Sequence, residues 1–130
     1  MPRLNVASGA PWEPIVGYSR AVRVGNQVFV AGTTALDEKG QLVGRGDPRA
    51  QTLQALRNVE RALGQAGAAL TDVVRTRVFV RDIAAWEQIG RAHGEVFRDI
   101  RPASTMVQVE ALIDPEMLVE IEADAVLDGP

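Results

Sequence analysis

Apolar residues alternate along the first part of the chain in the pattern of a β-hairpin. The segment Tyr18–Val24 predicts a strand, Gly25-Asn26 a tight turn, and the segment 27–34 the returning strand. A glycine-rich loop over 37–47 follows. The chain therefore opens with two paired strands before any helix.

The first helix is predicted to begin at Asp47-Pro48. Aspartate accepts hydrogen bonds from the free amides of a first helical turn, and proline fits that turn. Its buried side is marked by residues at three- and four-residue spacing: Thr52, Ala55, Leu56, Val59, Leu63 and Ala66. Gly67 is placed to end the helix in a left-handed conformation.

The second half of the chain repeats this strand and helix pattern. The segment 72–80 has the length and β-branched content of a strand, and Asp82 follows as a second N-cap. The apolar side of the second helix is formed by Trp86, Ile89, His93, Val96 and Phe97. Two strands, roughly 105–109 and 117–127, flank a turn at Asp114-Pro115.

The order ββαβαββ predicts a single α+β domain over residues 1–130, with two helices on one face of a mainly antiparallel sheet. A face that meets water should be polar, but Val28 and Phe29 are both apolar and point in opposite directions. Met106 and Val107 repeat this arrangement. Because one domain has nothing left to cover the second face, we expect a closed homo-oligomer.

Charged residues alternate with apolar ones on two of the predicted strands. One strand should place Val74, Thr76, Val78 and Val80 on one face and Arg75, Arg77 and Phe79 on the other. The last strand sets Val119, Ile121 and Ala123 opposite Glu120, Glu122 and Asp124. The charges belong on the oligomer face, either to bind a carboxylate substrate and manage protons or as ion pairs between subunits.

Composition excludes several function classes. The 130 residues contain no cysteine, which excludes thiol nucleophiles, thiolate metal sites and disulfides and makes the cytosol the default compartment. No apolar run approaches the ~20 residues of a membrane span. A net charge of -3 with interspersed signs offers no basic face for phosphates, so we expect neither a nucleic-acid nor a membrane partner.

Some candidate residues have two interpretations. Gly32, at the end of the second strand, either admits a ligand close to the backbone or relieves a bulge. His93 is the only histidine and makes no metal site, so we expect it to pack. Trp86 and Tyr18 suit packing, although Tyr18 is placed to line a pocket edge.

Met1-Pro2 resembles the start of tautomerases, small trimeric enzymes whose processed N-terminal proline acts as a base. With methionine retained, that amine is blocked. We therefore give this alternative little weight, since a motif of two residues occurs often by chance.

Four segments resemble the YjgF/RidA family over nearly the whole chain. They are GYSRAVRVGNQVFVAGT, AQTLQALRNVERALGQAGAAL, DVVRTRVFVRDI and RPASTMVQVEALIDPEMLVEIEADAV. The resemblance implies a chorismate-mutase-like fold and a homotrimer whose sheets form a central barrel, with three ligand clefts between subunits. It also implies cofactor-free hydrolysis of reactive enamines and imines, such as 2-aminoacrylate, to 2-keto acids and ammonia.

The same resemblance assigns roles to individual residues. Tyr18 matches the aromatic residue of the cleft, Gly32 the backbone amide that meets the ligand, and Glu120 the acid that orients water or a proton. Thr33 lies beside this backbone amide.

The turn before the predicted fourth strand departs from the family pattern. Where the family reads Pro-Ala-Arg-Ser, this chain reads Pro102-Ala103-Ser104-Thr105, so Ser104 replaces the arginine that holds the substrate carboxylate. Losing that contact should cost about 1.5–3 kcal/mol in binding. Met106 replaces a frequent cysteine, and Arg77 or Arg20 is a candidate source of the missing charge. The substrate is then changed, or the protein is a non-catalytic small-molecule-binding trimer.

Overall fold

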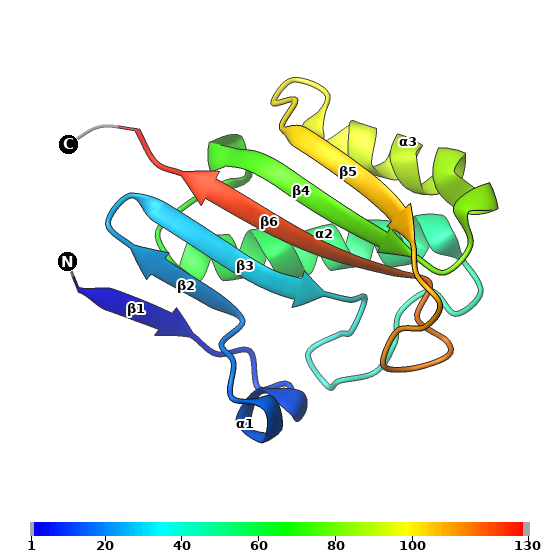
Figure 1. Cartoon of the computed structure of the whole chain (residues 1–130), viewed down its shortest axis with the longest axis horizontal. Coiled ribbons are helices and arrows are strands. Elements are labelled where there is room, and N and C mark those ends of the chain that lie inside the picture. Colours follow the sequence, from blue (N-terminus) through cyan, green and yellow to red (C-terminus); the bar gives the residue numbers. More distant parts are fainter. Residues whose placement is uncertain (1, 129–130) are drawn as a thin grey trace.

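A six-stranded sheet in the order β1-β2-β3-β6-β4-β5 frames the protein, which a computed structural model describes over residues 2–128 (Figure 1). Neighbouring strands are antiparallel except β4 and β5, which are parallel. The strands are β1 (Arg3–Val6), β2 (Ala21–Val24), β3 (Gln27–Thr33), β4 (Val73–Val80), β5 (Ala103–Gln108) and β6 (Val119–Val126). The helices are α1 (Trp12–Val16), α2 (Pro48–Gln65) and α3 (Trp86–Phe97), with 3-10 turns at Leu70–Asp72 and Ile83–Ala85.

The predicted α+β fold is confirmed, with α2 and α3 on one face of a mainly antiparallel sheet (Figure 1). Two elements precede the predicted ββαβαββ order, namely β1 and α1. Each is only four or five residues long, which is too short for a periodic pattern to stand out. Met1, on which the tautomerase alternative depends, lies outside the described residues.

The ends of α2 follow the sequence prediction. The Asp47 side chain accepts a hydrogen bond from the Ala50 amide at 3.1 Å, and Gly67 has a φ of 84°. A Cβ on Gly67 would lie 2.6 Å from Nη1 of Arg23, which donates to the carbonyl of Ala66 at 2.9 Å. Arg23 therefore ties the end of α2 to the β2–β3 hairpin.

The core lies between the sheet and the two long helices. Val28 and Val30 of β3 are buried there, as are Val119, Ile121 and Ala123 of β6. The predicted alternation of β6 is therefore correct. On the opposite face, Phe29 is 45% exposed and Val107 is 42% exposed, so a single chain leaves that face uncovered.

The predicted direction of Val74 is wrong. Val73 is buried and Val74 is 47% exposed, whereas Thr76, Val78 and Val80 point inward as expected. The pairing of β4 with β6 shifts between Val73 and Arg75, which marks a bulge. An extra residue reverses the alternation before it, so a strict two-residue period fails at this point.

The apolar side predicted for α3 is also only partly correct. Ile89 and Phe97 are buried, but Trp86 is 58% exposed because it is the first helical residue and follows a 3-10 turn. No helix within residues 2–128 is long and apolar enough to cross a membrane.

Candidate functional site

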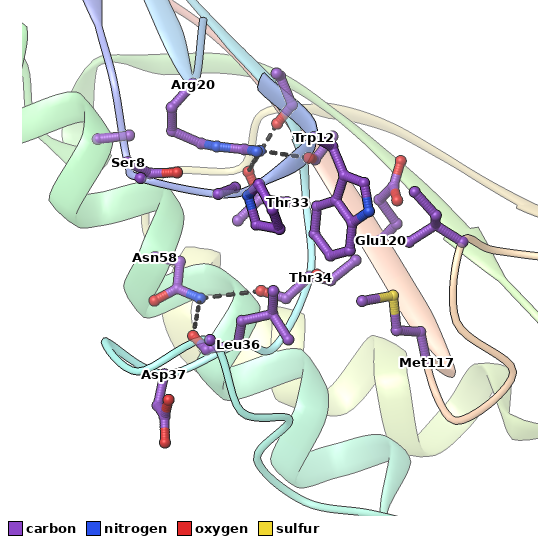
Figure 2. Close-up of a pocket in the computed structure, with 18 of the residues that line it drawn as sticks. Ser8, Trp12, Arg20, Thr33, Thr34, Leu36, Asp37, Asn58, Met117 and Glu120 are labelled. Carbon is purple, nitrogen blue, oxygen red and sulfur yellow. Dashed lines mark hydrogen bonds between the residues drawn. The ribbon is translucent and has the colours of Figure 1, made fainter. Parts of the chain in front are cut away.

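A cavity of about 1170 Å³ opens where the end of β3, the start of β6, α2 and the segment around α1 meet (Figure 2). Four of the predicted site residues contribute to its wall, together with Arg20: Tyr18, Gly32, Thr33 and Glu120. Trp12 and Met117 add apolar surface that sequence analysis did not select. Trp12 comes from the short α1, which has no periodic signal, and Met117 comes from the loop just before β6, where the sequence predicted the start of that strand.

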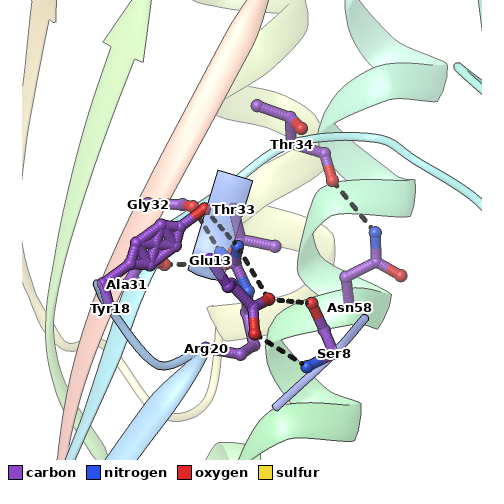
Figure 3. A network of polar contacts seen from close by, with 9 residues as sticks. All are labelled: Ser8, Glu13, Tyr18, Arg20, Ala31, Gly32, Thr33, Thr34 and Asn58. Carbon is purple, nitrogen blue, oxygen red and sulfur yellow. Dashed lines mark hydrogen bonds and ion pairs between the residues drawn. The ribbon is translucent and has the colours of Figure 1, made fainter. Parts of the chain in front are cut away.

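Arg20 is the centre of a polar network in the cavity wall (Figure 3). Its guanidinium donates to the carbonyl of Gly32 and, at 3.2 Å, to the Thr33 hydroxyl. It also donates to the Tyr18 hydroxyl at 3.2 Å and lies 5.4 Å from the centre of that ring. Because these acceptors belong to the wall itself, Arg20 holds the wall together.

Glu13 of α1 compensates the buried charge of Arg20. Its carboxylate lies 3.7 Å from an Arg20 nitrogen, and both side chains are at most 10% exposed. Glu13 also accepts hydrogen bonds from the Ser8 amide at 3.2 Å and from the Ser8 hydroxyl. Sequence analysis missed Glu13 and Ser8 because neither belongs to a motif and their partner is brought near only by folding.

The Glu120 carboxylate packs directly against Gly32. A Cβ on Gly32 would lie 2.2 Å from Oε2 of Glu120, and the β3–β6 pairing shifts between Val30 and Thr33. The glycine lies at a bulge, as one of its two interpretations predicted, and the lack of a side chain makes room for a close contact. The approaching group within the chain is the side chain of Glu120.

Burial raises the pKa of the Glu120 carboxyl above its ordinary value. The positive charge of Arg20 opposes this shift, and the neighbouring carboxylate of Glu122 adds to it. A half-buried carboxyl in a cavity, with a pKa that burial raises, is a candidate for giving and taking a proton in a reaction.

Replacing Gly32 by alanine should displace the Glu120 carboxylate, because the new methyl group and Oε2 cannot occupy the same space. The displaced group becomes more hydrated, so its pKa should fall toward the ordinary value in a carbon-detected NMR titration. Gly64→Ala is the matched control, since a Cβ there meets nothing within 4 Å. An unchanged Glu120 titration in Gly32→Ala would show that the two groups do not compete for space.

Three other predicted site residues lie outside this cavity. Ser104 is on β5, where its hydroxyl lies 2.7 Å from Oγ1 of Thr76, and Met106 packs against the core. Arg77 pairs with Glu122 at 3.5 Å and with Asp124 at 3.3 Å. These ion pairs join β4 to β6 of the same chain, whereas sequence analysis expected the charges either to bind a substrate carboxylate or to form ion pairs between subunits.

His93 lies on α3, away from the cavity. Its ring packs on Phe97 at 4.6 Å between centroids, and Nε2 lies 2.9 Å from Thr76 Oγ1. Burial lowers the pKa of the imidazole. Within residues 2–128, no group of three His, Asp or Glu side chains is arranged to hold a metal ion.

The fold and cavity define a class of small α+β proteins, and comparison with known proteins identifies it. Residues 8–127 match the family model described as Endoribonuclease L-PSP. Rv2704 of Mycobacterium tuberculosis, a member of the YjgF/YER057c/UK114 family, is 54% identical with a TM-score of 0.89, covering 97% of this chain and 100% of that one. The chain belongs to the YjgF/RutC/RidA family.

Two sequence relatives point in the same direction. The 3-aminoacrylate deaminase RutC of Acinetobacter baylyi is 36% identical, over 96% of this chain and 98% of its own length. A RutC family protein of Pyrococcus abyssi is 38% identical, over 87% of this chain and 88% of its own. The resemblance inferred from the sequence is therefore confirmed.

Proposed function

We propose that this protein is a cytosolic enzyme that hydrolyses reactive enamines or imines of small amino acids to carbonyl compounds and ammonia. The observation that carries this proposal is the half-buried Glu120 carboxyl in the cavity, whose pKa burial raises. The name of the Acinetobacter relative, a 3-aminoacrylate deaminase, supports an enamine acid as the substrate class.

The proposed chemistry requires one carboxyl group and one water. Protonated Glu120 donates its proton to the enamine carbon, which gives the iminium ion, and the Glu120 carboxylate then removes a proton from the water that attacks the iminium carbon. The resulting carbinolamine loses ammonia as the carbonyl forms. The balance is one enamine and one water consumed, and one carbonyl compound and one ammonia released, so no metal or other cofactor is needed.

The first test is direct assay of the purified protein with 2-aminoacrylate, 3-aminoacrylate and aliphatic imines. Release of ammonia and the matching carbonyl compound above the uncatalysed rate is expected for at least one substrate. No acceleration with any of them would overturn the proposal.

We further propose that the functional cleft lies between subunits of a homotrimer, with Ser104 and Met106 supplied by a neighbouring chain. Proteins of this family are generally small and oligomeric. The sheet face with Phe29 and Val107 exposes apolar side chains that an oligomer would cover. Analytical ultracentrifugation at micromolar concentration should give three times the 14.0 kDa chain mass. A monomer would contradict this proposal.

A non-catalytic binding trimer is the second candidate, and Ser104 favours it because a hydroxyl holds a carboxylate less firmly than a guanidinium does. Ser104→Arg distinguishes the two candidates. An added charged contact should tighten the binding of small carboxylates such as pyruvate by about ten- to a hundredfold. If the protein is an enzyme, kcat/KM for an enamine acid should rise together with the affinity for pyruvate. If it is a non-catalytic binder, the affinity should rise while turnover stays absent. Unchanged pyruvate affinity would show that Ser104 does not face the ligand.

A further inference from the structure

A hydrogen-bond chain joins the outer strand of the sheet to α3. Ser104 Oγ lies 2.7 Å from Thr76 Oγ1, and Thr76 Oγ1 lies 2.9 Å from His93 Nε2. Ser104 is exposed, Thr76 is fully buried, and His93 is half-buried. This hydrogen-bond relay thus leads from a surface hydroxyl through one buried hydroxyl to an imidazole.

The fold holds all three groups in place. Thr76 and Ser104 are paired in the parallel register of β4 and β5, so their side chains point to the same face of the sheet. That face is covered by α3, where the His93 ring packs on Phe97. The relay therefore depends both on the register of β4 and β5 and on the position of α3.

The direction of one hydrogen bond fixes the direction of the others, because each hydroxyl has a single hydrogen to donate. When His93 carries a proton on Nε2, it donates to Thr76, Thr76 donates to Ser104, and the Ser104 hydrogen is free to point outward. When Nε2 of His93 is unprotonated, the Thr76 hydroxyl donates to it and the Ser104 hydroxyl donates to Thr76. Ser104 then offers only lone pairs to a ligand.

We propose that His93 is a positioning residue which, through Thr76, makes the Ser104 hydroxyl a donor to a carboxylate or carbonyl oxygen of the ligand. This inference rests on the proposed function for the place of Ser104 at the ligand. A ligand oxygen that accepts from Ser104 favours the form of His93 with a proton on Nε2, whereas a ligand ammonium group that donates to Ser104 favours the form in which Nε2 is unprotonated. This relay thereby supplies a directed neutral donor at the position where the resemblance to the family implies an arginine.

The ligand-free protein provides the first test. Nitrogen NMR of the labelled imidazole reports which His93 nitrogen carries the proton. Thr76→Val and Ser104→Ala should each change the His93 signals, whereas Thr105→Val should not, because Thr105 is on the same strand but points to the other face. His93 signals that are the same in all four proteins would overturn the relay.

Pyruvate provides the second test. In the wild-type protein its binding should increase the share of His93 with a proton on Nε2. In Thr76→Val that response should vanish and pyruvate should bind about three- to tenfold more weakly. Thr76→Ser should behave like wild type. His93→Gln, which keeps a donor group, should bind pyruvate more tightly than His93→Leu.

The outcomes separate this inference from the proposed function. Wild-type protein that does not bind pyruvate, or that binds it without any response of His93, overturns the inference. Intact binding and an intact His93 response without turnover of any enamine or imine overturn the proposed function and leave the positioning role supported.

Discussion

Replacing Glu120 by glutamine is expected to lower the turnover of enamine or imine substrates by about a hundredfold or more. Glutamine keeps the shape of the side chain and its contact with Gly32 but can neither donate nor accept the transferred proton. Because the defect concerns proton transfer, kcat should fall much more than KM changes. The rate of ammonia release at saturating substrate concentration measures kcat.

A measurement of folding stability shows whether the lost turnover of Glu120→Gln comes from the chemistry or from unfolding. Burial raises the pKa of Glu120 in the folded state, so the ionised carboxylate costs stability once the pH rises above its unfolded value. Glu120→Gln should therefore be at least as stable as wild type at neutral pH, and this advantage should vanish as the pH falls below the unfolded pKa. Glu60→Gln, which makes the same acid-to-amide change at an exposed position of α2 outside the cavity, is the matched control. Full activity in Glu120→Gln would remove this carboxyl from the mechanism.

Replacing Glu13 by leucine is expected to lower the free energy of unfolding by about 2–4 kcal/mol, because it leaves the Arg20 charge buried without its acid. The double variant Glu13→Leu/Arg20→Met should recover part of that loss, since it removes both charges. Chemical denaturation of the two single variants, the double variant and wild type gives the coupling energy. Glu87→Leu, in an exposed pair with Arg91, should cost about 0.5 kcal/mol or less.

Additive effects of the Glu13 and Arg20 changes would show that the pair does not stabilise the cavity wall.

The polar network around Arg20 also bears on the arginine that the family resemblance implies and this chain lacks. Arg20 lies in the cavity, but its terminal nitrogens already donate to Gly32, Thr33 and Tyr18. Arg77 is engaged by two carboxylates on β6. Arg20 is therefore committed to the cavity wall, whereas both contacts of Arg77 use one nitrogen and its side chain is 42% exposed, so Arg77 stays a candidate source of the missing charge.

The local rules of the sequence were sufficient for the span of α2 and for most of the sheet, but they missed β1 and α1, and the predicted cap Asp82 caps a 3-10 turn and not α3 itself. Asp47 and Gly67 mark the ends of α2 because capping depends on neighbouring residues alone. The alternation of β6 is correct because side chains of a regular strand point to opposite faces in turn. The same rule failed at Val74, where β4 carries an extra residue against β6. A bulge depends on the partner strand and leaves no mark in its own sequence.

The sequence by itself determined the family, through its resemblance over nearly the whole chain, and the α+β fold, through local periodicity. It also proposed Glu120, Gly32 and Tyr18 as site residues, and the structure places all three in one cavity wall. Only the tertiary structure decided which side chains meet. The cavity joins residues from α1, β3 and β6, and the relay joins β4, β5 and α3. Such contacts depend on strand register and helix packing between distant parts of the chain, which no local pattern encodes.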